Sequence, residues 1–167
     1  RQQEKLQFDL KVTDSSHLLQ IQGQITPIQA VFNDSLKRSL QWSATARLRD
    51  ILVSEWFPRQ TQTIRLNLDL DVHGRGYPLH ESMIHAKINA FDSGSKRWMI
   101  DQFTAQGDWN RGRLSASGQI ISSIGAADFN LSTSPIAQAQ PFQVQTAVKN
   151  LDVAALSPQL PSSALNF

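Results

Sequence analysis

Cysteine is absent from the 167-residue sequence. A chain without thiols has no disulfide framework, no thiolate metal site and no cysteine nucleophile. Charged residues are scarce, at 18%, and Lys+Arg 16 against Asp+Glu 14 leaves a net charge of +2. That small surplus provides no electrostatic footprint for nucleic acid. No apolar run approaches the roughly 18 residues that a membrane-spanning helix needs. The composition therefore argues against thiol enzymes, nucleic-acid binders and helical membrane spans.

Most of the chain instead alternates between apolar and polar residues. The clearest run, from 64 to 72, has apolar residues at every even position: Ile64, Leu66, Leu68, Leu70 and Val72. The same alternation occurs in the segments 6–12, 19–25, 40–48, 84–90, 114–120, 127–131 and 142–148. A period of two is typical of strands with one apolar face and one polar face, which favours an antiparallel sheet. We therefore predict an all-β meander of hairpins with turns at 92–95 and 110–112.

Three places depart from this alternation. Between Ile100 and Phe103 the apolar phase shifts by one residue, which predicts a β-bulge. Residues 49–57 and 151–156 carry apolar residues at helical spacing and end before a proline, which predicts two short helices. In the first helix we expect three side chains to form one apolar stripe that packs across an end of the sheet or against its edge: Ile51, Leu52 and Trp56.

The segment at 49–57 also resembles the segment at 151–156, at an offset of about 100 residues. Leu48-Arg49-Asp50-Ile51 aligns with Val148-Lys149-Asn150-Leu151, and the similarity extends from 46–68 to 146–167 after a slip of one residue. We predict a repeat unit of about 100 residues. Because the first residue is Arg1 and not Met, we expect residues 1–167 to be a single β-rich segment excised from a longer repeat protein.

The residues that could carry catalysis have simpler explanations. His80-Glu81 and His85 are similar to the zinc-protease motif, but their spacing is five residues where a helical pair of ligands needs four. Asp69 and Asp71 share one strand face, which we expect to be a solvated charged surface and not a desolvated carboxylate pair. We therefore expect no catalytic residues, no metal, no cofactor and no enzymatic activity.

Two phrases of the sequence resemble a known family. The first is the strand–turn–strand pattern from Ile100 to Ile120, with its turn at Asn110-Arg111-Gly112. The second is Asn150-Leu151-Asp152-Val153-Ala154-Ala155-Leu156-Ser157-Pro158-Gln159-Leu160-Pro161. Both are similar to phrases of the AsmA-like/TamB family, and the stretch from Asp50 to Pro58 is a weaker copy of the second. Together these three stretches cover about a quarter of the chain.

The resemblance implies a long Gram-negative envelope protein that is anchored in the inner membrane outside this segment and crosses the periplasm. It implies a sheet curled into an open trough, or β-taco, with an apolar interior that conducts phospholipid toward the outer membrane. It also implies a role in outer-membrane biogenesis with a barrel partner such as TamA, as in the translocation and assembly module.

We expect a non-enzymatic segment that holds the acyl chains of phospholipids. Asn67, on the opposite strand face from Leu68, should face water. Eleven apolar residues should line the lipid groove: Leu66, Leu68, Leu70, Ile84, Ile88, Leu114, Ile120, Phe129, Leu131, Phe142 and Val144.

Two other function classes stay open. One is a protein-interaction module whose exposed edge strands pair with client strands, or with a second copy of the fragment, during barrel or secretion-system assembly. The other is a closed β-sandwich adhesin or carbohydrate-binding domain. The small residues of the apolar face, such as Gly23 and Gly118, argue against a sandwich because they leave space that a dry core must fill.

Overall fold

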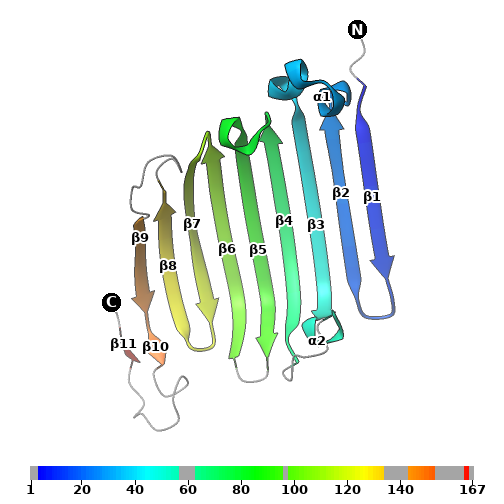
Figure 1. Ribbon diagram of the computed structural model, residues 1–167. Helices are drawn as coiled ribbons and strands as arrows, with labels where there is room; N and C mark the ends of the chain where they lie inside the picture. The colour runs from blue at the N-terminus through cyan, green and yellow to red at the C-terminus, as the bar shows by residue number, and fades with distance from the viewer. Residues whose placement is uncertain (1–3, 57–62, 96–97, 134–142, 153–163, 166–167) are drawn as a thin grey trace.

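The computed structural model describes residues 4–56, 63–95, 98–133, 143–152 and 164–165. Nine strands form one antiparallel sheet in which each strand pairs with its neighbours along the chain (Figure 1). They are β1 (Leu6–Thr13), β2 (Leu18–Thr26), β3 (Gln41–Leu52), β4 (Arg65–Arg75), β5 (Met83–Ser95), β6 (Trp98–Asn110), β7 (Arg113–Ser122), β8 (Gly125–Ser132) and β9 (Gln143–Lys149). The sheet is not closed into a barrel, since β1 and β9 lie at opposite edges. The prediction of an open, all-β antiparallel meander is confirmed.

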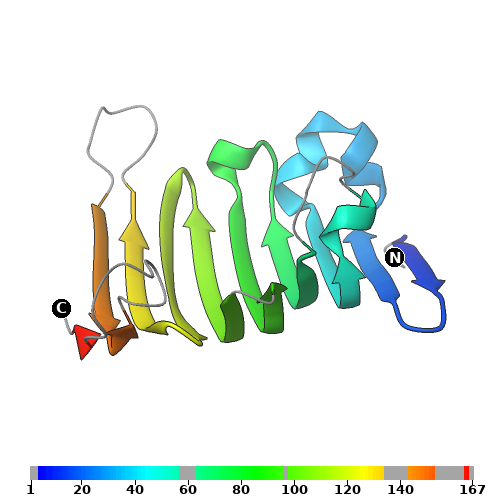
Figure 2. The same cartoon turned by 90° about the horizontal axis from the view of Figure 1, so that it is seen from below.

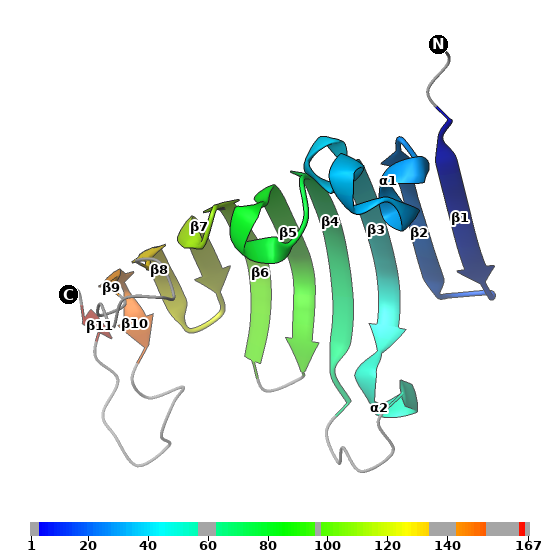
Figure 3. The ribbon, with the colours of Figure 1, turned by 45° about the horizontal axis from the view of Figure 1, so that its top comes forward.

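Short helices lie at the strand ends. We call the end where β2 stops and β3 starts the upper end; it carries α1 (Gln29–Phe32), η1 (Asp34–Ser39) and η2 (Leu79–Glu81) (Figures 1 and 3). The lower end carries α2 (Val53–Trp56) and a separate two-stranded pair of β10 (Leu151–Asp152) with β11 (Ala164–Leu165). Within the described ranges, no helix has the length and apolar character needed to cross a bilayer.

The sheet is a single layer. Seen along its strands, it forms one row, and the described residues contain no second sheet packed on it as a sandwich would require (Figure 2). The chain exposes 11736 Å², whereas a compact protein of this size exposes about 8,300 Å². Among the described apolar side chains, only Ala30, Ile51 and Ala90 are buried. The described part of the chain therefore folds without a conventional two-layer core.

The helix predicted over 49–57 is confirmed at 53–56, where α2 lies, and is wrong at 49–52. Strand β3 continues to Leu52, and Ile51 is buried at 6% exposure opposite Leu66. The register between β3 and β4 shifts between Leu48 and Ile51, where Asp50 adopts a φ of 53°. This bulge inserts one extra residue, so the apolar side chains on either side of it lie three residues apart, as they would in a helix. The predicted apolar stripe is therefore part of a strand, and the side chain of Trp56 lies outside the described part of the structure.

The other local predictions have mixed outcomes. The turn at 110–112 and the bulge near Ile100 are confirmed, because β7 begins at Arg113 and its register with β6 shifts between Ile100 and Gln102. The turn predicted at 92–95 is wrong, since these residues complete β5 and Asp92 forms a bulge with a φ of 43°. Of the helix predicted at 151–156, residues 151–152 form a strand and the others lie outside the described residues.

The two segments aligned as a repeat share their backbone geometry. Asp50 and Asn150 both have a φ of 53°; Asp50 is followed by the last two residues of β3, and Asn150 by the two-residue strand β10. The residues that follow pair in equivalent register: Ile51 with Leu66, and Leu151 with Leu165. The repeat of about 100 residues stays a prediction, and this shared geometry supports it.

Candidate functional site

One face of the sheet is apolar across all nine strands. Direct cross-strand pairing joins the apolar position of each strand to that of the next, so that these side chains share a face. The central row runs from the first edge strand to β8: Leu10, Ile21, Ala46, Leu70, Ile88, Ala105, Gly118 and Phe129. We call the surface formed by this row and the parallel rows two residues away the apolar face, and the opposite surface the polar face.

Ten of the eleven predicted lining residues lie on the apolar face. Nine of them are partly buried: Leu66, Leu68, Leu70, Ile84, Ile88, Leu114, Ile120, Phe129 and Leu131. Val144, on edge strand β9, is 50% exposed. Phe142 lies outside the described residues. The predicted set is therefore brought together on one surface, and its role as a lipid groove stays a prediction.

Aromatic rings lie over glycines of the neighbouring strand. The pairs are Phe8 over Gly23, Trp42 over Gly74 and Phe129 over Gly118, each directly opposite in register. A Cβ atom at Gly118 would stand 2.5 Å from Cζ of Phe129, so the ring occupies the space that a side chain would need. The ring of Phe129 also stacks against that of Phe103, with centroids 6.1 Å apart.

These rings fill the space that the three glycines leave on the apolar face. The small residues predicted open space on this face, whereas aromatic rings occupy the space over three of the glycines. A glycine aligned opposite an aromatic residue in the hairpin register was the signal that could have revealed it.

The polar face carries a ladder of ion pairs. Arg49 Nη2 donates to both carboxylate oxygens of Asp69 at 2.7 and 2.9 Å, and Arg47 Nε donates to the same carboxylate at 3.4 Å. His85 Nδ1 is hydrogen bonded to Asp108 Oδ1 at 2.7 Å. The described residues contain no cluster of three potential metal ligands. These titratable groups therefore act as cross-strand partners.

At the edge formed by β9, Lys149 donates through Nζ to Asp128 of β8 at 2.9 Å. This ammonium group holds the pKa of the Asp128 carboxyl below its usual value, and a hydrogen bond from Gln119 acts in the same direction. The pair joins the edge strand to the body of the sheet.

A hollow of about 850 Å³ crosses the polar face from β2 to β8. It lies between two rows of polar side chains, one of which contains Thr45, Lys87 and Gln106, and the other Arg47, Asn89 and Thr104. Amides, hydroxyls and charged groups therefore make up most of its lining, together with residues of the central row such as Ala46, Leu70 and Ile88. The concavity predicted for the apolar face stays a prediction.

The two edges of the sheet are open. Every residue of β1 is exposed, including the apolar residues Leu6, Phe8, Leu10 and Val12 at 43–55%. Among the described residues, β1 pairs with β2 alone and β9 with β8 alone, so each edge presents unpaired backbone groups.

Asn67 does not face water as predicted. It is 5% exposed, and its polar groups bind the bulges of both neighbouring strands. The alternation places Asn67 on the polar face correctly, but the bulged backbones of β3 and β5 close over it. It therefore belongs to the structural framework and cannot serve as a water-facing reference position.

Comparison with known protein families, curated proteins and solved structures finds no match. The functional assignment therefore depends on the surfaces described above.

Proposed function

We propose that this chain is a non-enzymatic, lipid-carrying segment of an AsmA-like/TamB-type envelope protein. In this proposal, the apolar face shields phospholipid acyl chains in transit between the inner and outer membranes. One observation supports it most directly. Nine strands present a continuous apolar face, and none of the described residues forms a second layer over that face.

The dimensions and chemistry of the apolar face fit acyl chains. Nine strands spaced about 4.8 Å apart make a surface about 40 Å wide. Apolar patches of this extent are rare on soluble monomers and mark interaction sites. Each buried methylene contributes about 0.8 kcal/mol without directional preference, so a chain can slide along the surface. The stacked rings of Phe129 and Phe103 add aromatic surface that acyl chains can contact.

The cellular setting follows the family resemblance. The segment would lie in the periplasm, as part of a protein anchored in the inner membrane through residues outside this sequence. A barrel such as TamA would be its outer-membrane partner. The hairpin that carries part of the resemblance, β6–β7, lies within the sheet and contributes Phe103, Leu114 and Ile120 to the apolar face.

Site-specific photo-crosslinking in cells tests the proposal. A photoreactive side chain at Leu68, on the apolar face, should capture phospholipid, whereas the same label at Asp71 should capture none. Asp71 is the matched control because it is exposed on the polar face of the same strand. Equal lipid capture at the two positions, or capture at neither, contradicts the proposal.

The exposed edge strand supports a second candidate function, strand pairing with a client protein. β1 offers a complete row of unpaired backbone groups together with exposed apolar side chains. A label at Leu10 that captures protein, in cells where a label at Leu68 captures no lipid, would favour this second function.

A further inference from the structure

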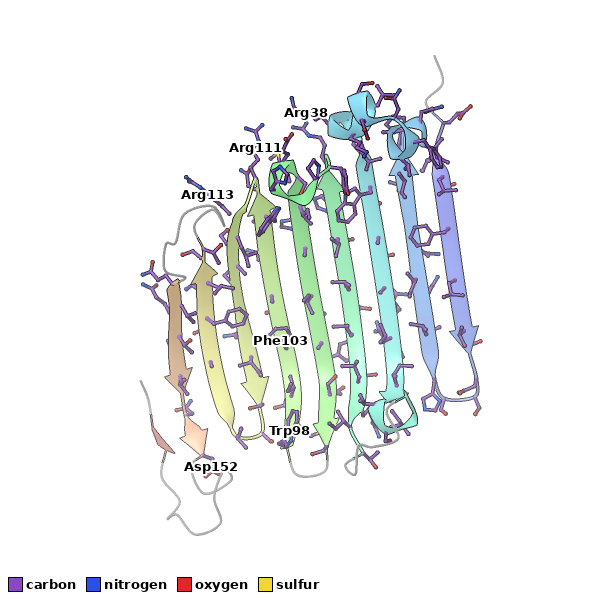
Figure 4. All side chains as sticks on the ribbon, viewed as in Figure 1. Arg38, Trp98, Phe103, Arg111, Arg113 and Asp152 are labelled. Atoms are coloured by element: carbon purple, nitrogen blue, oxygen red, sulfur yellow. The ribbon has the colours of Figure 1, made fainter. Side chains whose placement is uncertain are left out.

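A hollow at the upper end of the sheet is lined by eight residues, three of which are arginines. It has a volume of about 460 Å³ and lies beside η2, away from the central part of the apolar face. Its lining includes Arg38, Arg75, Tyr77, His80, Glu81 and Arg111. Figure 4 shows Arg38 and Arg111 at this end of the molecule, with Arg113 nearby.

The arginines come from η1, the end of β4 and the β6–β7 turn, and backbone hydrogen bonds join the three neighbouring connections at this end of the sheet. Gly76 N–H, after β4, donates to the carbonyl of Leu40 at 2.8 Å. Arg111 N–H, in the β6–β7 turn, donates to the carbonyl of Ser82 at 2.9 Å, and Ser82 is buried. Arg111 itself has a φ of 49°, a left-handed conformation fixed by the turn. The backbones that carry the three guanidinium groups are therefore held in place relative to one another.

The charges in this hollow are unbalanced. Glu81 is the one carboxylate among the lining residues, and Arg38 Nε donates to it at 3.0 Å. Arg75 contacts the sulfur of Met83 at 3.8 Å, and neither Arg75 nor Arg111 forms an ion pair within the described part of the chain. Three arginines against one glutamate leave the hollow with a surplus of positive charge and with unused guanidinium donors.

We propose that this hollow binds a phosphate-type oxyanion, with Arg75 and Arg111 as its principal ligands. A guanidinium group offers paired N–H donors that match two phosphate oxygens, and charge-assisted hydrogen bonds of this kind are about twice as strong as neutral ones. The anion is either a soluble phosphate or the phosphate of a lipid headgroup, which share this chemistry. The site stands on its own residues and does not depend on lipid binding by the apolar face.

Nuclear magnetic resonance titration of the chain with inorganic phosphate tests the site. We expect saturable shifts at the residues lining the hollow, and a loss of affinity of about tenfold or more in Arg111→Gln, since a charged hydrogen-bond donor is removed. Arg113→Gln is the matched control because it removes the same charge from an exposed position two residues away, outside the hollow. Its affinity should change by less than about twofold. Arg75→Gln provides a second test if Arg111→Gln disturbs the turn.

Vesicle binding distinguishes the two sources of phosphate. If the site takes a lipid headgroup, Arg111→Gln should reduce cosedimentation with phosphatidylglycerol vesicles, and Arg113→Gln should not. If Arg111→Gln weakens phosphate binding and leaves vesicle binding unchanged, the ligand is a soluble phosphate. Absence of saturable phosphate binding, or equal losses in the Arg111 and Arg113 variants, overturns the site. None of these outcomes alters the photo-crosslinking result at Leu68. Either proposal can therefore be contradicted while the other stands.

Discussion

The side-chain carbonyl of Asn67 accepts a hydrogen bond of 2.8 Å from the backbone N–H of Asp50. The same amide donates through Nδ2 to the carbonyl of Asp92 at 3.0 Å, and the backbone N–H of Asn67 donates to Ser93 Oγ at 2.9 Å. Asp50 and Asp92 are the bulge residues of β3 and β5, on either side of β4. One buried amide therefore satisfies backbone groups that both bulges remove from the regular ladder.

This arrangement predicts a large effect of Asn67→Ala on stability. The substitution leaves the Asp50 N–H and the Asp92 carbonyl without their partner, which costs about 1–3 kcal/mol for each buried group that stays unsatisfied. Urea unfolding followed by circular dichroism should show the loss. Asn89→Ala, at an exposed position on the polar face of β5, is the control and should change stability by less than about 0.5 kcal/mol. Equal effects of the two variants would mean that the amide does not stabilise the bulges.

The ring of Phe129 predicts different tolerance at two glycines of the apolar face. In Gly118→Ala, the new Cβ would lie 2.5 Å from both Phe129 Cζ and the backbone oxygen of Thr104, so the ring and a strand must move. Overpacking of this kind costs about 1–3 kcal/mol. In Gly107→Ala, the nearest atom is the Cβ of Ala116 at 3.4 Å, an ordinary contact. Thermal unfolding should therefore show destabilisation by the first substitution and little change from the second; the reverse order would contradict the ring position.

The ion pair between Asp128 and Lys149 predicts a pH dependence at the β9 edge. The pKa of Asp128 is lowered in the folded chain, first by the hydrogen bond from Lys149, so its contribution to stability is present above the unfolded value of 3.8 and is lost as pH falls below it. At pH 7, Asp128→Asn should reduce the hydrogen-exchange protection of the β9 amides relative to the wild-type chain. As the pH falls below 3.8, the two chains should converge. High salt at pH 7 should also reduce the difference in protection between the two chains, since the ion pair is exposed to solvent and is screened by salt. A difference that is independent of pH would assign the effect to packing.

The period-two pattern was sufficient to predict the strands and the shared face of residues such as Leu68, Ile88 and Phe129. The bulges were harder to predict from the sequence. Asp50 and Asp92 each break the alternation by one residue, and a single extra residue resembles a helical or turn signal. The alternation could not predict the basic hollow, because Arg38, Arg75 and Arg111 come from η1, the end of β4 and the β6–β7 turn, which hydrogen bonds between neighbouring connections hold together. Alternation also could not distinguish a single layer from a sandwich, since an apolar face has the same period whether or not another sheet covers it.

That distinction makes Leu68→Asp the most informative substitution on the apolar face. In a dry two-layer core, a carboxylate at this position would be unpaired and would unfold the domain. In the single layer, Leu68 is only partly buried, so the carboxylate keeps contact with water and the chain should stay folded by circular dichroism. When acyl chains cover the face, however, the carboxylate loses that water at a cost of several kcal/mol. A photoreactive label at Ile88, on the same face of the adjacent strand, should then capture much less phospholipid in cells. Asn89→Asp adds the same charge on the polar face and should leave capture at Ile88 unchanged. A folded and abundant Leu68→Asp variant with full lipid capture would show that acyl chains do not use this surface.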